Sequence, residues 1–181
     1  MSWNLKLLET MKDPEYIVKK TEKLVAIKDK FPKAKHHFLI LPTEKLDTIR
    51  NLTREHVGLV KEMSQMALEV IGNVGQKKEN FLIGFHAEPS MIRVHLHVIS
   101  KDFISPCLKT KSHWNSYNTS FLWPAAKIIS DLEKLGKVES LSVLEFKQVL
   151  GAPLKCNSCS YIAKNMPNLK NHLLTHESLY E

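Results

Sequence analysis

Two histidines stand one residue apart in an apolar run, in the stretch MIRVHLHVIS at residues 91–100. Successive side chains of an extended strand point to opposite faces. One face of a strand over 93–100 would then be apolar and the other polar: Val94, Leu96 and Val98 against Arg93, His95 and His97. A guanidinium and two imidazoles on one face suit an anionic ligand.

A neutral imidazole can attack phosphorus while nearby cations hold the non-bridging oxygens. Polar residues near in the sequence could complete such a site, His86, Ser90 and Arg93, and another strand would bring Lys33 and His37. Two other interpretations of His95 and His97 are a metal site and a structural pair. Because no Asp, Glu or Cys in the strand completes a ligand set, the residues favour phosphate chemistry.

A second cluster has the spacing of a metal site, Cys156-x2-Cys159-x12-His172-x3-His176. Two thiolates from a tight turn and two imidazoles one helical turn apart supply four ligands for tetrahedral zinc. The sequence therefore predicts a C2H2 zinc finger with a structural Zn²⁺ ion. Such a finger can bind DNA, dock a protein or brace a neighbouring domain.

The elements that must position these residues can be read from hydrophobic spacing. We expect helices at 3–12, 54–71 and 124–136 and strands at 24–29, 36–42, 81–87 and 93–100. Asp13-Pro14 ends the first helix, and Thr53 is a suitable N-cap for the second. The first two strands should pair as a hairpin. Strands and helices without βαβ alternation indicate an α+β fold with an antiparallel sheet.

The composition is that of a globular protein with a net charge of +7 and a pI near 9.3. This charge favours a polyanionic partner such as nucleic acid, although a solvated lysine-rich face gives the same balance. Three clustered cysteines do not form a disulfide framework, and Cys107 suits a small buried position. No apolar run approaches a membrane span and no secretory signal is visible, so we expect an intracellular protein without membrane contact.

The residues resemble the histidine triad (HIT) superfamily of nucleotidyl hydrolases and transferases. RVHLHVI at 93–99 is similar to its His-φ-His-φ-His-φφ signature, with Arg93 in place of the first histidine. DKFPKAKHHFLILP at 29–42 resembles its upstream hairpin, and the fused finger resembles one branch of the family. The resemblance implies an α+β, HIT-type antiparallel sheet with flanking helices, plus a small C-terminal C2H2 zinc finger. The HIT catalytic domain with its N-terminal helix would be 1–150 and the finger 151–181.

That branch of the family removes AMP from 5′-adenylated DNA, the product of abortive ligation at strand breaks. The resemblance implies that His95 is the nucleophile and forms an adenylyl-histidine, leaving a 5′-phosphate. It also implies a nuclear protein whose zinc is structural and whose hydrolytic step needs no metal. Two alternatives stay open, a HIT hydrolase of small adenylated nucleotides and a noncatalytic module that binds DNA ends.

The same resemblance assigns roles to the other residues. His97 and His37 would bind the phosphate, Ser90 would contact the phosphate and the leaving oxygen, and His86 would stand on the leaving-group side. Asp29 would bind the ribose hydroxyls, or else cap a turn. Arg93 would support the site as a charged donor to a phosphate-rich nucleotide. The expected DNA contacts are Trp3, which could instead be a core residue, with Lys33, Lys109 and Lys111.

Overall fold

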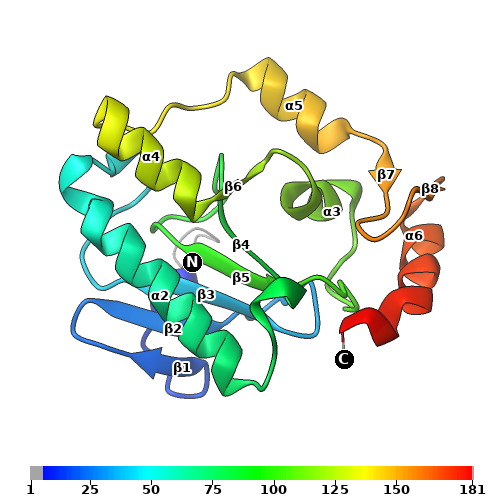
Figure 1. Cartoon of the computed structure of the whole chain (residues 1–181), viewed down its shortest axis with the longest axis horizontal. Coiled ribbons are helices and arrows are strands. Elements are labelled where there is room, and N and C mark those ends of the chain that lie inside the picture. Colours follow the sequence, from blue (N-terminus) through cyan, green and yellow to red (C-terminus); the bar gives the residue numbers. More distant parts are fainter. Residues whose placement is uncertain (1–5, 181) are drawn as a thin grey trace.

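In the computed structural model, which describes residues 6–180, a six-stranded antiparallel sheet forms the centre (Figure 1). Its strands lie in the order β1-β2-β3-β5-β4-β6. Their bounds are β1 Ile17–Lys20, β2 Leu24–Lys28, β3 His37–Pro42, β4 Phe81–His86, β5 Leu96–Ser100 and β6 Leu122–Pro124. The antiparallel α+β class predicted from the sequence is confirmed.

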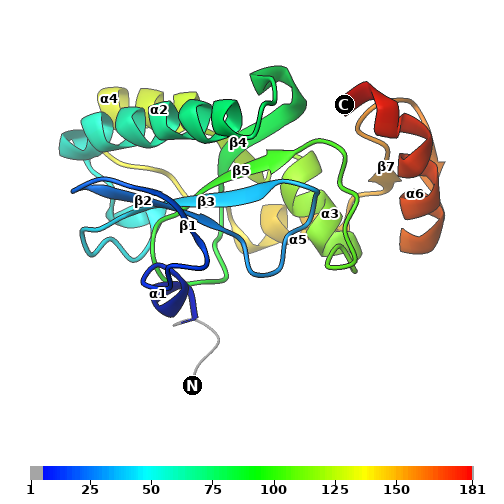
Figure 2. The ribbon, with the colours of Figure 1, turned by 90° about the horizontal axis from the view of Figure 1, so that it is seen from below.

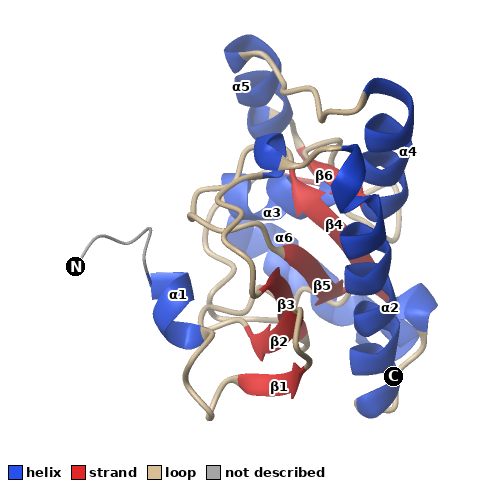
Figure 3. Ribbon diagram, turned by 90° about the vertical axis from the view of Figure 1, so that its left-hand side faces the viewer, coloured by secondary structure: helices blue, strands red, loops and turns tan. Residues whose placement is uncertain are grey.

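Helices α2 (Val57–Asn73) and α4 (Ala125–Leu135) cover one face of the sheet, and α1 (Lys6–Thr10) lies on the other (Figures 2 and 3). Alternation along the strands decides which side chains meet which helices. Phe38, Ile40, Leu96 and Val98 join the core under α2 and α4. Their neighbours in the two strands, the histidines among them, therefore face the side of α1.

The remaining helices form the end of the molecule nearest the C-terminus: α3 Lys111–Asn118, α5 Val143–Gly151 and α6 Met166–Leu173. The short strands β7 (Leu154–Lys155) and β8 (Ile162–Ala163) pair in a small hairpin before α6. Single turns of 3₁₀ helix complete the described elements at Ile49–Asn51, Arg54–His56 and Lys78–Asn80, and a longer one at Leu174–Tyr180. No helix within residues 6–180 is long and apolar enough to cross a membrane.

Most predicted elements are present with shifted ends. The hairpin of β2 and β3 is confirmed, with Ala26 opposite Ile40. Thr53 is the N-cap of a 3₁₀ turn that runs directly into α2. The edge strand β1 was not predicted, because IVKK at 17–20 has no clear alternation. The expected strand at 93–100 is too long, because the strand begins only at Leu96.

The finger shares a core with the rest of the chain. Its buried Leu154, Leu169 and Leu173 belong to one apolar cluster with Ile99 and Trp114. The Trp114 indole donates a hydrogen bond to the carbonyl of Lys155 at 3.0 Å, which joins α3 to the finger. The predicted boundary between residues 150 and 151 stays a prediction, but no gap in packing marks it.

The finger also reaches the strand ends that border the histidine face. The Asn157 side chain donates to the Lys101 carbonyl at 2.7 Å, just past β5. Lys35, in the turn before β3, forms a 2.5 Å ion pair with Glu177 at the end of the finger. An exposed pair of this kind contributes little stability by itself, about 0–1 kcal/mol. Together with the shared core, these contacts hold the finger in a fixed position.

Gly84 in β4 provides the first test of the packing. A Cβ atom built there would lie 2.7 Å from the carbonyl oxygen of Trp123 and 2.9 Å from the Leu122 side chain. We predict that Gly84→Ala destabilises the protein by about 1–3 kcal/mol, because backbone must move to admit the methyl group. Chemical denaturation measures this. Gly58→Ala, in α2 with open space around it, should be neutral or stabilising, and equal effects of the two changes would contradict the packing described here.

Candidate functional site

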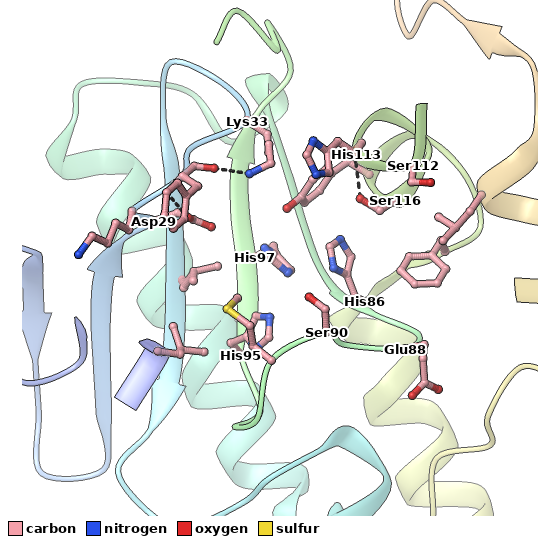
Figure 4. Close-up of a pocket in the computed structure, with 18 of the residues that line it drawn as sticks. Asp29, Lys33, His86, Glu88, Ser90, His95, His97, Ser112, His113 and Ser116 are labelled. Carbon is pink, nitrogen blue, oxygen red and sulfur yellow. Dashed lines mark hydrogen bonds between the residues drawn. The ribbon is translucent and has the colours of Figure 1, made fainter. Parts of the chain in front are cut away.

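A cavity of about 360 Å³ opens on the α1 side of the sheet (Figure 4). Its polar lining includes Asp29, Lys33, His86, Ser90, His95 and His97. Its apolar lining comes from α1, β2, β3, the segment before β6, and α5. These residues are Leu7, Ile27, Leu39, Phe121, Phe146 and Leu150. The cavity thus brings together five of the residues that the sequence placed at a phosphate site, Lys33, His86, Ser90, His95 and His97, with Asp29, which was expected at the ribose. Their chemical roles stay predictions.

Strand pairing sets the spacing of the histidines. His97 of β5 lies opposite Leu39 of β3 on one side and opposite Gly84 of β4 on the other. His37 begins β3 and His86 ends β4, so their rings approach that of His97 from two sides. The centroid of the His97 ring lies 5.4 Å from that of His37 and 4.1 Å from that of His86. The His95 ring is 4.8 Å away, nearly perpendicular to it.

His95 is oriented by the main chain. Its Nδ1 lies 2.8 Å from the carbonyl oxygen of Arg93. Because a carbonyl can only accept a hydrogen bond, the proton of neutral His95 is on Nδ1 and the lone pair is on Nε2. A ring nitrogen with a free lone pair is the atom that a nucleophile needs.

A chain of hydrogen bonds fixes the protons of the next two histidines. The backbone N–H of Lys33 donates to His37 Nδ1 at 3.3 Å, so the proton of His37 is on Nε2. That nitrogen lies 3.1 Å from His97 Nδ1 and donates to it. The proton of His97 is consequently on Nε2, and His97 can act as a hydrogen-bond donor from that nitrogen.

Burial keeps these imidazoles neutral. His37, His95 and His97 are each at most 5% exposed. Desolvation lowers the pKa of His37 to about 4, although Asp29 nearby opposes the shift. Burial also lowers the pKa of His95, against the hydrogen bond to Arg93, and it lowers the pKa values of His86 and His97 well below the usual value. The 3.4 Å approach of His37 to Asp29 is therefore not an ion pair at neutral pH.

Two ring nitrogens in the cluster have no partner. His86 Nε2 and His97 Nε2 are buried, and neither makes a hydrogen bond to the described part of the chain. Leaving a buried polar atom unpaired costs about 1–3 kcal/mol. Two such atoms on neighbouring rings, beside the lone pair of His95, mark a position suited to the oxygens of a ligand.

Asp29 and Lys33 stand at the β2–β3 side of the cavity. Asp29 accepts a 2.7 Å hydrogen bond from the Phe31 N–H, so it caps the turn as one interpretation expected. The same carboxylate also lines the cavity, so the turn does not exclude a ribose contact. The Lys33 ammonium donates to the Phe31 carbonyl, and burial lowers its pKa. Ser90 lies across the cavity in the β4–β5 connection (Figure 4).

The position expected for Arg93, on the strand face beside His95, is wrong. Arg93 precedes β5 and has a φ of 101°, in the region that glycine favours. Its guanidinium donates to the Glu44 carbonyl at 2.8 Å and does not line the histidine cavity. The strand alternation fails because the chain turns at this residue, which directs its carbonyl, not its side chain, toward the His95 ring.

The structure describes only some of the residues that were predicted to contact DNA. Trp3 lies outside the described residues. Lys109 lies just before α3 and Lys111 is its first residue; both are exposed, and neither lines the cavity. Their roles stay predictions.

Sequence reasoning missed Tyr117 and its neighbours on α3. The Tyr117 ring lies 4.8 Å from that of His86 and 5.3 Å from that of His97, and burial raises its pKa well above 10. Ser112, His113 and Ser116 line the same wall. The spacing of His113, Ser116 and Tyr117 at i, i+3 and i+4 is the signal that could have found this helix face.

The finger residues are arranged for a metal ion. Cys156, Cys159, His172 and His176 each place one ligand atom within 4.8 Å of the others. Cys159 Sγ and His176 Nε2 each lie 3.2 Å from His172 Nε2. Two sulfur and two nitrogen atoms so close together fit tetrahedral zinc, which would hold the β7–β8 hairpin on α6.

The buried histidines predict a pH dependence of stability. The pKa of His37 is about 4 when folded, against 6.5 for an exposed histidine, so the unfolded chain binds the extra proton between these values. Stability should fall as the pH drops through this window, by roughly 2 kcal/mol at pH 5 from His37 alone. Urea denaturation at pH 7.5 and pH 5 measures the slope. His37→Gln should show a shallower loss than the wild-type protein, and an equal or steeper one would contradict the burial of a neutral His37.

Comparison with known proteins agrees with this arrangement. Residues 2–113 match the family described as "Scavenger mRNA decapping enzyme C-term binding", and residues 118–178 match the "C2HE / C2H2 / C2HC zinc-binding finger". An aprataxin-like protein of Drosophila melanogaster is 45% identical over 97% of this chain, and aprataxin of Gallus gallus is 41% identical over 96%. The chain spans 27% and 55% of the lengths of these two relatives.

Solved structures show the same fold. The aprataxin ortholog Hnt3 from Schizosaccharomyces pombe matches with a TM-score of 0.75 and 23% identity, over 96% of this chain and 91% of its own. Hnt3 in complex with DNA matches with a TM-score of 0.74 and 24% identity, over 97% and 94%. The matched family model covers residues 2–113, more than half of the sequence, and the chain therefore belongs to the histidine triad family.

Proposed function

We propose that this protein is a DNA 5′-adenylate hydrolase, which removes AMP from abortive ligation products at strand breaks and leaves a 5′-phosphate. The observation that carries the proposal is the pair of buried Nε2 atoms of His86 and His97, which make no hydrogen bond within residues 6–180, beside the Nε2 lone pair of His95. This arrangement offers one nucleophile and two polar contacts to a single phosphorus centre.

In the first step, His95 Nε2 attacks the phosphorus of the adenylate. The new N–P bond forms as the bond from phosphorus to the bridging oxygen breaks, and the electron pair leaves with that oxygen on the DNA 5′-phosphate. The adenylylated ring carries a positive charge. Its Nδ1–H continues to donate to the Arg93 carbonyl, 2.8 Å away, which stabilises the charge.

In the second step, water attacks the same phosphorus. The N–P bond breaks, its electron pair returns to Nε2 of His95, and AMP leaves with the oxygen of the water. The proton of the water passes to a product phosphate, whose second pKa is near 6. The low pKa of His95 supports this step, because a weakly basic imidazole is a good leaving group. The scheme uses no metal ion.

His97 and His86 fit different tasks in this scheme. His97 Nε2 carries a proton by the hydrogen-bond chain from Lys33 and His37, so it donates to a non-bridging oxygen. His86 and Ser90 line the same cavity, on the side where the DNA phosphate would depart (Figure 4). Burial lowers the pKa of His86 well below 6.5, so the ring is neutral. We therefore assign it a hydrogen bond to the departing oxygen without transfer of a proton to that oxygen. A 5′-phosphate leaves as a stable anion without a proton.

A DNA substrate is supported by the relatives and by charge. The neighbouring structures include Hnt3 bound to DNA, and another has Hnt3 with DNA and guanosine. The net charge of +7 favours a polyanion. Lys109 and Lys111 are exposed, and we infer that they contact backbone phosphate. With this substrate the expected place of action is the nucleus.

The test uses a nicked duplex that carries a 5′-adenylate. The wild-type chain should release AMP and leave a 5′-phosphate, measured by gel electrophoresis and nucleotide chromatography. His95→Ala should lose at least about 10³-fold in kcat, because no other group can form the covalent intermediate.

Two controls make this test specific. His36→Gln, whose ring stacks on Phe38 and Phe81 away from the cavity, should keep wild-type turnover. A soluble AMP conjugate is assayed in parallel, because a cavity of this size also fits a small adenylated nucleotide. Equal kcat/KM on the soluble conjugate and the nicked DNA would replace the DNA function with the small-nucleotide one. Full activity of His95→Ala would overturn the mechanism.

A further inference from the structure

A second cavity, of about 270 Å³, lies beside the first, and α1 contributes to both. Leu7 and Thr10 of α1 line the histidine cavity, whereas Leu8 and Met11 line the second one. Residues three apart share one face of a helix, so Leu7 and Thr10 lie on one face, and Leu8 lies on the adjacent face with Met11, the residue just after α1. The other lining residues of the second cavity come from five segments: Lys12, Lys20, Val25, Thr43 and Arg93.

The lining of the second cavity has one sign of charge. Lys12, Lys20 and Arg93 are cationic, and no carboxylate lines it within the described chain. Leu8, Met11 and Val25 supply an apolar floor that lowers the local dielectric and strengthens the attraction for an anion. A guanidinium with two ammonium groups is a set that suits phosphate oxygens.

Arg93 connects this cavity to the nucleophile. Its backbone holds a φ of 101°, which costs on the order of 1–3 kcal/mol for a residue with a side chain. In this conformation its carbonyl accepts from His95, and its side chain turns to the second cavity. One donor of the guanidinium binds the Glu44 carbonyl, and the buried Nε makes no hydrogen bond to any described residue.

We propose that this cavity is a second phosphate site, which binds a backbone phosphate of the same DNA molecule whose adenylated end enters the histidine cavity. The proposal rests on the proposed function. An α-helix is about 10 Å across and a DNA strand carries one phosphate per about 3.4 Å of axis, so the bound phosphate lies roughly two to four nucleotides from the end. Occupancy of this site fixes Arg93, and through its carbonyl the ring of His95.

The test separates individual phosphates. Nicked duplexes with a plain 5′-phosphate at the nick are made with a neutral methylphosphonate at one of the first six positions on each side. Affinity is measured by fluorescence anisotropy for the wild-type chain, for Arg93→Gln and for Lys12→Gln. We expect one position where the methylphosphonate weakens wild-type binding about 5- to 10-fold but adds less than 2-fold in either variant.

Lys134→Gln is the matched control, because it removes the same charge from the exposed surface of α4, on the opposite face of the sheet. It should keep the wild-type pattern. Variants that respond to every methylphosphonate as the wild-type chain does would overturn the second site. The second site would also be overturned if crystals show inorganic phosphate in this cavity but no methylphosphonate position loses its effect in the Arg93→Gln and Lys12→Gln variants. If the wild-type chain binds no nicked duplex at all, the proposed function fails as well, and the two failures are thus distinguishable.

Discussion

The placement of uncharged imidazoles against the buried face of the sheet is the constraint on which the rest of the site depends. His37, His95 and His97 lie where water cannot solvate an imidazolium, so desolvation holds their pKa values low. A neutral ring has one proton and one lone pair, and their positions decide which ring attacks and which donates. Main-chain groups make that choice, since the Arg93 carbonyl and the Lys33 amide each admit only one tautomer of the ring they contact.

The surrounding fold maintains this arrangement. Gly84 leaves no side chain beside His97, so the close pairing of β4 with β5 and β6 is possible. Tyr117 closes the cluster from α3, and α3 is held by the indole of Trp114 on the finger backbone. The finger therefore contributes to the site by packing, whatever it contributes to binding. The cation Lys33 lines the cavity, where it attracts an anion without protonating the nucleophile.

Much of this could be predicted from the sequence because it rests on local rules. The spacing of Cys156, Cys159, His172 and His176 predicts a metal cluster, and the alternation of Leu96 to Val98 predicts a buried strand. The polar residues of neighbouring predicted strands suggested that His37 and His86 join His97, and the family resemblance then assigned their roles. Arg93 was misplaced because alternation assumes a regular strand, and a positive φ at an arginine has no sequence signal. Tyr117 was missed because its ring partners His86 and His97 are distant from it in the sequence, and only the folding of α3 against the sheet brings them together.

The central claim is that folded His95 is a neutral imidazole with its proton on Nδ1 and its lone pair on Nε2. Nitrogen-15 NMR of histidine-labelled protein at pH 7, with the resonance assigned by comparison with His95→Ala, reports this directly. The account predicts a protonated Nδ1 and an unprotonated Nε2 for this residue. An imidazolium, or a neutral ring with its proton on Nε2, would contradict it.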